Sequence, residues 1–233
     1  MKILITGGCG FIGSSLALFL REKIKNVKIT SVDNLSRRGS GLNYKRLIAK
    51  KIKNFKYDIA KKDNLRKLPR FDLVIHCAAE PAIEASRKKL EEVFNSNLVG
   101  TLNVLKKCAK DKSNIIYLSS SRVYSMNNLF KLKNKGSVKE NFNTENAKSI
   151  YGFTKLTSEH LIKEYAYLYK IKYLINRVAL VSGPWQFGKE EQGFVSLWVW
   201  RHINNFKLNF IGFNGTGRQV RDVLHIKDLC ELI

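Results

Sequence analysis

The chain has 233 residues, of which 44% are hydrophobic and 26% charged, a composition that builds a globular core and excludes a disordered protein. Its formal charge of +23 would suit a nucleic-acid partner. The lysines are scattered, however, without interleaved aromatics or a DNA-reading motif, so we predict no nucleic-acid partner. A preference for polyanions is the weaker alternative. Four distant cysteines indicate neither disulfides nor a metal site, and no apolar run suits a signal peptide or membrane span, so we expect a cytoplasmic protein.

Strand-like and helix-like segments alternate along most of the chain. Apolar bursts rich in β-branched residues predict strands at 2–6, 27–33, 55–59, 71–78, 114–120 and 173–181. Apolar stripes predict helices over 12–23, 90–110 and 151–169. Because parallel strands need a crossover, and a helix is the usual one, this order predicts an α/β fold with a doubly wound parallel sheet.

Two segments depart from the alternation. Residues 125–149 are rich in Asn, Lys, Gly and Ser and are predicted to form a long surface loop. After residue 183 aromatics and glycines no longer alternate with strands. We therefore expect a first domain over 1–183 and the beginning of a second, smaller lobe over 184–233.

Three glycines follow the first predicted strand and open the first predicted helix. Gly7, Gly10 and Gly13 fall in the order G-G-x-G-x-x-G. Because Gly7 and Gly10 carry no side chain, backbone N–H groups and the positive end of the helix can face a pyrophosphate there, while Gly13 lets helix and strand pack closely. Alone, such a match more often marks a tight turn; a strand before it and a helix after it favour a dinucleotide site.

A carboxylate ends the second predicted strand. Asp33 lies twenty residues past Gly13, where it can accept both hydrogen bonds from an adenosine ribose. A 2′-phosphate would meet like charge there, which favours NAD over NADP. Arg37 and Arg38 weaken this preference, because basic residues just beyond the strand often hold NADP. Without the glycines, Asp33 would be interpreted as a helix cap or turn residue.

A tyrosine and a lysine supply the second piece of chemistry. Tyr151 and Lys155 are four residues apart, hence one turn apart on the same helix face. A phenol with a pKa near ~10 is a poor base at pH 7, but a nearby ammonium such as Lys155 and a charged nicotinamide favour the phenolate. An isolated Y-x-x-x-K is usually a surface pair. Here a strand ends thirty-one residues earlier in serines, and Ser120 could help orient a proton transfer.

Together these motifs resemble the extended short-chain dehydrogenase/reductases, the nucleotide-sugar epimerase and dehydratase group. The resemblance covers essentially the whole chain and rests on "TGGCGFIGS", "DNLSRRG", "YDI", "HCAAEPAI", "NLVGTLNVL", "SSSRVY", "YGFTK", "SGPWQFG" and "GTGRQVRDVLHIKDL". It implies a Rossmann-type NAD-binding domain over 1–183, an incomplete substrate-binding lobe over 184–233, and a nucleotide-diphosphate sugar as substrate, with no metal.

The resemblance also assigns residues. The implied catalytic residues are Ser120, Tyr151 and Lys155, with Ser119 and Ser121 near enough to confuse the choice of hydroxyl. The implied cofactor-binding residues are Gly7, Gly10, Phe11, Ile12, Gly13, Asp33, Asn34, Ser36, Arg37, Asp58, Ile59, Ala78, Ala79, Asn97, Tyr151 and Lys155, with 58–59 beside the adenine and 78–79 beside the pyrophosphate and ribose. The implied substrate-binding residues are Gln186, Gln192 and Arg221, the last on the substrate diphosphate.

Local differences narrow the reaction. The family's 4,6-dehydratases carry an acid pair directly after the catalytic hydroxyl, whereas this chain has Ser121 and Arg122, which disfavours dehydration and the related decarboxylation. The run "GPWQFGKEEQGFVSLWV" resembles the CDP-paratose 2-epimerase (CDP-tyvelose epimerase) branch, which implies a role in cell-surface polysaccharide synthesis. Two glutamines there offer donors and acceptors for sugar or base. The aromatics offer apolar walls, or equally the core of a small lobe: Trp185, Phe194, Trp198 and Trp200.

The implied reaction is a transient oxidation. Tyr151, as phenolate, removes the hydroxyl proton at carbon 2 of the sugar while bound NAD takes the hydride from that carbon. The 2-keto sugar presents its other face, and hydride and proton return, so the stereocentre is inverted without net redox change. NAD must stay bound throughout.

Two departures from the family leave alternatives open. Ser125 stands where the family usually has glycine after the Val-Tyr pair, and the chain ends well before relatives usually do, which indicates a fragment or a natural truncation. The alternatives are a UDP-hexose 4-epimerase and a truncated, non-catalytic NAD-binding module. Relatives commonly pair through helices equivalent to 90–110 and 151–169, so we expect a dimer or tetramer.

Overall fold

The computed structural model describes residues 1–81, 90–131, 137–146, 149–189, 192–210, 213–217 and 220–233. It divides into two compact units, Met1–Val178 and Ala179–Ile233, a boundary a few residues earlier than the one expected from the sequence. None of the helices in the described ranges is both long and apolar enough to span a membrane.

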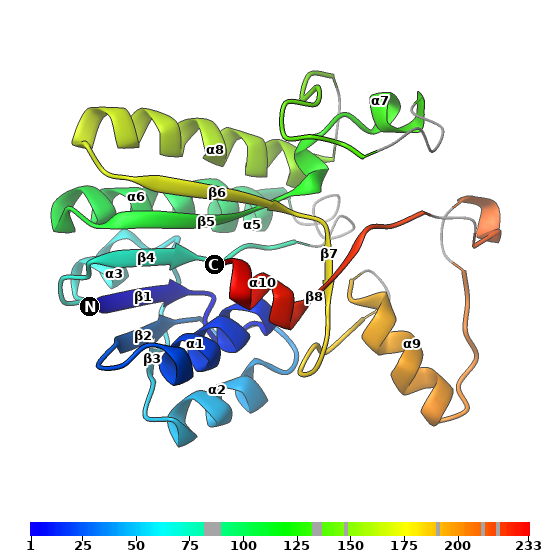
Figure 1. Cartoon of the computed structure of the whole chain (residues 1–233), viewed down its shortest axis with the longest axis horizontal. Helices are drawn as coiled ribbons and strands as arrows, with labels where there is room; N and C mark the ends of the chain where they lie inside the picture. The colour runs from blue at the N-terminus through cyan, green and yellow to red at the C-terminus, as the bar shows by residue number, and fades with distance from the viewer. Residues whose placement is uncertain (82–89, 132–136, 147–148, 190–191, 211–212, 218–219) are drawn as a thin grey trace. The chain divides into compact units, whose positions relative to one another are not determined.

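The first unit is built on a parallel sheet (Figure 1). Its strands are β1 (Lys2–Thr6), β2 (Lys28–Val32), β3 (Lys53–Phe55), β4 (Leu73–His76), β5 (Asn114–Ser120) and β6 (Tyr173–Val178). They lie in the order β3-β2-β1-β4-β5-β6, and every neighbouring pair is parallel. The predicted doubly wound Rossmann-type sheet is confirmed.

Helices cover both faces of this sheet. They are α1 (Phe11–Lys23), α2 (Ser40–Ala49), α3 (Lys62–Arg66), α5 (Leu90–Phe94), α6 (Gly100–Asp111) and α8 (Ile150–Tyr169). A further helix, α7 (Met126–Lys131), lies away from the sheet in Figure 1. Helices α1 and α2 pack together on one face, and α6 packs with α3 and α8 on the other (Figure 1). Strands buried on both faces need continuous apolar runs, which is why β1 and β4 are "KILIT" and "LVIH".

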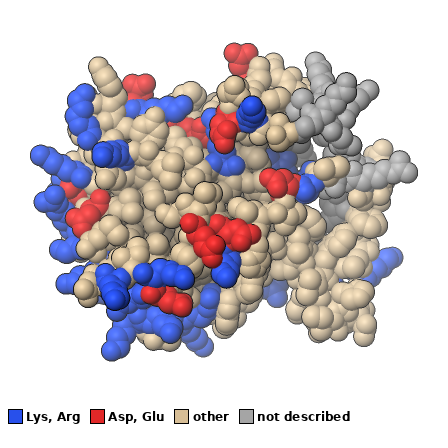
Figure 2. Space-filling model, in the orientation of Figure 1, with Lys and Arg blue, Asp and Glu red and all other residues tan. Residues whose placement is uncertain are grey.

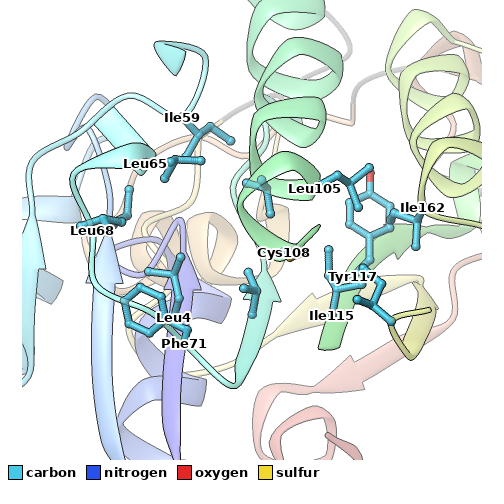
Figure 3. Packing of buried hydrophobic residues seen from close by; sticks show 14 of the residues in the cluster. Leu4, Ile59, Leu65, Leu68, Phe71, Leu105, Cys108, Ile115, Tyr117 and Ile162 are labelled. Atoms are coloured by element: carbon cyan, nitrogen blue, oxygen red, sulfur yellow. The ribbon is translucent and has the colours of Figure 1, made fainter. Parts of the chain in front are cut away.

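The core lies between the sheet and the helices α3, α6 and α8 that cover one of its faces. Leu4, Leu105, Tyr117 and Ile162 are at most 1% exposed and belong to one cluster, seen from close by in Figure 3. Fully burying one aliphatic side chain of this kind contributes ~1.5–3 kcal/mol. The cluster therefore fixes β1, β5, α6 and α8, which position the site described below.

The predicted strand at 55–59 is wrong in extent. The strand ends at Phe55, and the Tyr57 amide donates to the Phe55 carbonyl in a tight turn. Asp58 then accepts the Ala60 amide on its carboxylate Oδ1 at 2.9 Å. A local bond of this kind competes with the sheet ladder, so the chain turns toward α3 instead of extending.

The predicted helix over 90–110 is interrupted. Residues Asn95–Val99 form a π-helical turn between α5 and α6. This turn places Asn97 in the interior, where it is 2% exposed. Single π-turns of this kind are frequent at functional sites.

The predicted loop over 125–149 begins with a helix, α7. The Ser125 hydroxyl accepts the Asn128 amide at 3.4 Å, and the Ser125 carbonyl accepts the Leu129 amide at 3.0 Å. Serine at the position where the family usually has glycine thus caps a helix. Residues 132–136 and 147–148 of the predicted loop lie outside the described residues.

The predicted strand over 173–181 is two strands. Strand β6 ends at Val178, and β7 (Leu180–Ser182) pairs in parallel with β8 (Val223–His225) in a separate sheet of the second unit. This unit also contains α9 (Phe194–Ile203), a 3-10 turn (Phe213–Gly215) and α10 (Ile226–Leu232). A period-2 apolar pattern cannot mark such a boundary, because both strands satisfy it.

Candidate functional site

The candidate site lies where the strand order reverses, at the carboxyl ends of β1 and β4. Gly7 follows β1 with a φ of +67°, and a Cβ there would lie 2.7 Å from the Ala78 amide nitrogen. A Cβ on Gly13 would lie 2.2 Å from the Gly7 carbonyl oxygen. On Gly10 it would meet only that same oxygen, at 3.1 Å. Packing therefore requires glycine at two positions, and the third leaves the backbone open to a ligand.

The amino end of α1 offers hydrogen-bond donors at this turn. Gly10 is the N-cap residue, and no side chain caps the helix. Phe11 and Ile12 begin α1, so their backbone N–H groups lack the intrahelical acceptors that later residues have. Together with the open approach at Gly10, this arrangement fits a pyrophosphate group.

Asp33 connects the end of β2 to the glycine turn. Its Oδ2 accepts the Cys9 amide at 3.0 Å, and its Oδ1 accepts the Leu35 amide at 2.8 Å. Burial raises the pKa of this carboxyl, while these N–H groups and the charge of Arg37 oppose the rise. The Gly10 amide also bonds this carboxylate, so three N–H groups share its roughly four acceptor sites and one site remains for a ribose hydroxyl.

The segments after β2 and β3 carry further residues that the sequence predicts for the cofactor. Asn34 accepts the Ser36 amide at 3.1 Å on an exposed turn. The Asn103 amide group donates to the carbonyls of Ile59 and Ala60, both at 3.0 Å, which holds the turn beside Asp58. The residues implied for adenine thus lie on a fixed turn.

Tyr151 and Ser120 are brought together by the start of α8. Ser149 caps this helix by accepting the Gly152 amide at 3.0 Å. A Cβ on Gly152 would lie 2.1 Å from the Arg122 carbonyl oxygen, so the helix packs directly on the 3-10 turn that follows β5. Ser120 ends that strand and hydrogen-bonds the phenol of Tyr151.

Opposing effects set the acidity of Tyr151. Burial raises its pKa to about 12, and the charge of Glu80 acts in the same direction. The Ser120 hydrogen bond and the positive charges of Arg122 and Arg37 lower it. The side chain is 9% exposed.

Lys155 lies one turn further along α8 and is 3% exposed. Its ammonium donates to the Leu118 carbonyl at 2.7 Å and lies 4.6 Å from the centre of the Tyr117 ring. Burial lowers its pKa to about 8. The ammonium is therefore held near the carboxyl end of β5.

The three serines at the end of β5 have separate environments. Ser119 donates to Glu159 Oε1 at 2.5 Å, and Glu159 in turn pairs with Arg177 at 2.7 Å. Ser121 begins the 3-10 turn. Of the three, Ser120 is the one that contacts Tyr151.

Asn97 joins the loop after β4 to α8. Its Oδ1 accepts the Glu80 amide at 2.8 Å, and its Nδ2 donates to the Glu80 carbonyl at 3.2 Å and to Thr154 Oγ1 at 3.0 Å. Arg37 Nη1 lies 3.9 Å from the Glu80 carboxylate. Sequence reasoning missed Glu80, which had no signal beyond its place two residues after Ala78, whose own amide donates to Thr6 Oγ1 at 3.4 Å.

His76 is a further residue that sequence reasoning missed. It is fully buried at the end of β4, with Nδ1 2.6 Å from Thr6 Oγ1 and Nε2 3.0 Å from Thr101 Oγ1. Burial, reinforced by the charge of Lys155, lowers its pKa to about 3. The local sequence shows only a single histidine in an apolar strand, and the two threonine partners cannot be predicted from it.

The three residues implied for substrate belong to the second unit. Gln186 donates to the Val181 carbonyl at 2.9 Å and accepts the Ser196 hydroxyl at 3.1 Å, so its amide holds this unit together. Gln192 pairs through its backbone with Lys189. Arg221 is exposed. Residues 190–191 and 218–219 of the same motifs lie outside the described residues.

The aromatic residues of this unit pack partly on one another. Trp198 lies edge-on to Phe194 and Phe210, with ring centroids 5.9 and 5.3 Å away. Trp185 and Trp200 remain 46% and 50% exposed. Helix α9 therefore combines a small aromatic cluster with exposed apolar surface.

Known proteins share this architecture. The model of the NAD dependent epimerase/dehydratase family matches residues 3–233. A CDP-paratose 2-epimerase of Salmonella typhi is 32% identical over the whole chain, which covers 73% of that protein. A dTDP-D-glucose 4,6-dehydratase of Dictyostelium discoideum is 31% identical over 98% of the chain, which covers 53% of it. The crystal structure of a Thermotoga maritima UDP-glucose 4-epimerase with UDP-glucose superposes with a TM-score of 0.85 at 28% identity, over 99% of this chain and 71% of that one.

Proposed function

The chain belongs to the NAD-dependent epimerase/dehydratase family, and from that membership we propose that it binds NAD and epimerises a nucleotide sugar. The observation that carries the proposal is the buried phenol of Tyr151, hydrogen-bonded to Ser120 in the unit that holds the glycine turn. The chain spans about half the length of the Dictyostelium relative. The activity, the substrate and the partners of the protein are therefore proposed here as properties to be measured.

NAD would be held by the turn after β1 and by residues that follow β2 and β3. The amino end of α1 would bind the pyrophosphate, Asp33 would accept from the adenosine ribose, and Ile59 would border the adenine. When bound, NAD accepts a hydride from the sugar carbon and later returns it. Because the same cofactor serves both half-reactions, tight retention by this turn is part of catalysis.

The proton is moved by Tyr151. Its phenolate takes the proton of the reacting sugar hydroxyl and gives it back after the keto sugar has turned its other face. Ser120 donates to the phenolate and orients the hydroxyl, and Arg122 adds positive charge that favours the ionised form. While it is protonated, Lys155 adds a further positive charge near the carboxyl end of β5.

Epimerisation is favoured over dehydration by the residues after Ser120. Dehydration would need an acid pair there to expel water, whereas the chain has Ser121 and Arg122. Arg122 contributes a fixed positive charge that lowers the pKa of Tyr151. A guanidinium cannot donate a proton at neutral pH, so it cannot replace the missing acid.

For the substrate, we propose CDP-paratose, converted to CDP-tyvelose by inversion at carbon 2. The support is the 32% identity to a CDP-paratose 2-epimerase over the whole chain, together with the run "GPWQFGKEEQGFVSLWV" after β7, which resembles that branch. Gln192 and Arg221 are the proposed substrate contacts. Since Gln186 is engaged within its own unit, its proposed role is to fix the start of α9.

A UDP-hexose 4-epimerase is the second candidate, favoured by the superposition on the Thermotoga enzyme. Both candidate reactions would use the same proposed cofactor and proton-transfer residues. They differ in the sugar, in the base and in the carbon that is inverted, carbon 2 or carbon 4. A non-catalytic NAD-binding module is the third. It would bind NAD and convert neither nucleotide sugar.

Product analysis by NMR separates these functions. The purified chain is incubated with NAD and either CDP-paratose or UDP-glucose in D₂O. We expect inversion of CDP-paratose without deuterium at the inverted carbon, because the hydride never leaves the site. Conversion of UDP-glucose alone assigns the second candidate, and NAD binding without turnover assigns the module.

A tyrosine pair on one helix provides the matched control. Tyr151→Phe should lower kcat by ~10²–10⁴-fold, the usual contribution of a positioned acid–base group. Tyr167→Phe removes the same hydroxyl from α8 at a site that is 75% exposed, and should leave kcat unchanged. Equal activity in both variants would contradict the assignment of Tyr151.

We also propose that the chain self-associates through α5, α6 and α8. These helices carry exposed apolar side chains, among them Leu90, Phe153 and Leu168 at 47%, 46% and 66% exposure. Sedimentation of the chain and of Phe153→Glu measures this directly. A dimer or tetramer that the variant weakens supports the interface, and a monomeric parent chain refutes it.

A further inference from the structure

A groove between α3 and α6 is lined mainly by basic side chains. Its volume is about 200 Å³, and it is bordered by Lys62, Leu65, Arg66, Asn103, Lys106, Lys107 and Lys110. Figure 2 shows basic side chains spread over the visible face of the molecule, so charge alone marks no site. A hollow lined by five basic side chains, in contrast, is a candidate binding site for an anion.

The cations of the groove differ in their partners. Lys107 donates to the Pro69 carbonyl and pairs with Asp111 at 2.6 Å, and both side chains are buried. Arg66 lies 3.5 Å from Asp63. In the described part of the chain, no carboxylate lies within ion-pair distance of the remaining lysines: Lys62, Lys106 and Lys110.

The size and chemistry of the groove select a compact anion. Its volume is below the ~300–1,000 Å³ typical of pockets for drug-sized ligands, so a whole nucleotide sugar does not fit inside. Three ammonium groups supply nine N–H donors to phosphate oxygens. Lys106 and Lys110 are one turn apart on α6, so both can reach one ligand.

The groove is connected to the turn at 58–60. Asn103 lines the groove and also donates to the carbonyls of Ile59 and Ala60 at 3.0 Å. From the α3 side, Asn64 Nδ2 donates to the Asp58 carbonyl at 3.1 Å. Both helices that line the groove therefore hold this turn in place.

We propose that the α3–α6 groove binds a phosphate or diphosphate group, and that its occupancy strengthens NAD binding through the hydrogen bonds that join α3 and α6 to the turn at 58–60. The first part is independent of the proposed function, whereas the second rests on it. Coupling of this kind is reciprocal: NAD raises the affinity of the groove for the anion by the same factor.

Calorimetric titration of inorganic pyrophosphate into the NAD-saturated chain tests the site. Saturating NAD keeps the glycine turn from competing for the probe. We expect one pyrophosphate per chain, bound about tenfold or more weakly by Lys106→Gln/Lys110→Gln, since two charge-assisted contacts are lost. Lys45→Gln/Lys50→Gln removes the same charge at α2, on the opposite face of the sheet, and should bind as the parent chain does.

Each other outcome overturns part of the proposal. Equal weakening in both double variants means general charge attraction, and no binding to the NAD-loaded chain removes the site. Inorganic phosphate and CDP, titrated alongside, distinguish a free anion from the diphosphate of a nucleotide. Tighter binding of a single-stranded oligonucleotide, lost in the groove variant, would assign the groove to nucleic acid. Pyrophosphate binding by a chain that fails to bind NAD would refute the coupling and the proposed function but leave the site.

Discussion

Acid should destabilise the first unit through His76. In the folded chain this imidazole is fully buried between Thr6 and Thr101, with a pKa lowered to about 3 from an ordinary value near 6.5. Between those two values the unfolded chain binds a proton that the folded chain does not. The stabilisation is therefore complete above pH ~6.5 and is lost as the pH falls toward ~3.

The size of this effect follows from the shift. One pKa unit is worth ~1.4 kcal/mol, so at pH 5, about 1.5 units below the unfolded value, His76 alone should cost ~2 kcal/mol. That is a large fraction of the ~5–15 kcal/mol that stabilises a typical domain. A urea midpoint will register it easily.

Urea unfolding at pH 7 and pH 5 measures the loss, with His76→Asn as the variant. Asparagine keeps a polar side chain near both threonines but does not titrate, so the variant should lose ~2 kcal/mol less than the parent between the two pH values. His160→Asn, at an exposed site on α8, should keep the full loss. If the parent chain and His76→Asn lost the same free energy, the buried neutral imidazole would be refuted as the cause.

Other substitutions separate folding from function. Gly10→Ala should leave stability within ~1 kcal/mol but weaken NAD binding at least about tenfold, because its Cβ enters the open approach; unchanged affinity would exclude a pyrophosphate there. Gly13→Ala should instead destabilise the fold by ~2 kcal/mol or more, since its Cβ would overlap the preceding turn. Glu159→Gln should cost ~2–3 kcal/mol in urea unfolding by leaving the guanidinium of Arg177 without its carboxylate, and a neutral result would show that the pair contributes nothing. The rate should fall as the pH rises through about 8, where Lys155 loses its proton, and a flat profile to pH 9 would contradict its role as a cation.

The parts of the site that the sequence predicted are those with a local chemical requirement. A glycine turn between strand and helix, and a tyrosine that starts a helix, are constrained by their own neighbours in the chain. Gly7 needs a positive φ, and Ser120 ends a strand whose position in the sheet follows from its apolar run. Residues of this kind can be placed before any tertiary contact is known.

The parts that the sequence could not predict depend on partners far along the chain. Ser119 and Glu159 are 40 residues apart, and their hydrogen bond gives Ser119 an environment different from those of Ser120 and Ser121. The Lys155 ammonium was expected to act as the charge beside Tyr151, yet its hydrogen bond runs to the Leu118 carbonyl. Spacing on a helix gives the face of a side chain but not the atom that it reaches.

The predicted fold is confirmed, but two segments differ from their predictions where local hydrogen bonds compete with the apolar pattern. The strand at 55–59 was shortened by the turn that Asp58 holds, and the loop at 125–149 gained α7 because Ser125 caps it. In both places a short polar side chain bonds the backbone of the next few residues. A hydropathy pattern does not show such hydrogen bonds, so it cannot predict where they end a strand or begin a helix.

The π-helical turn at Asn95–Val99 makes the site sensitive to chain length as well as to side chains. It holds one residue more per turn than the α-helix around it, so removing a single residue there would restore regular winding. With or without the extra residue the segment winds the chain by about one turn, so α5 and α6 would keep their relative orientation while the residues inside the turn are redistributed around it. Asn97 would then swing away from Glu80 and Thr154 although no contact residue had been substituted, so a deletion scan across this turn can disconnect two loops that point substitutions leave joined.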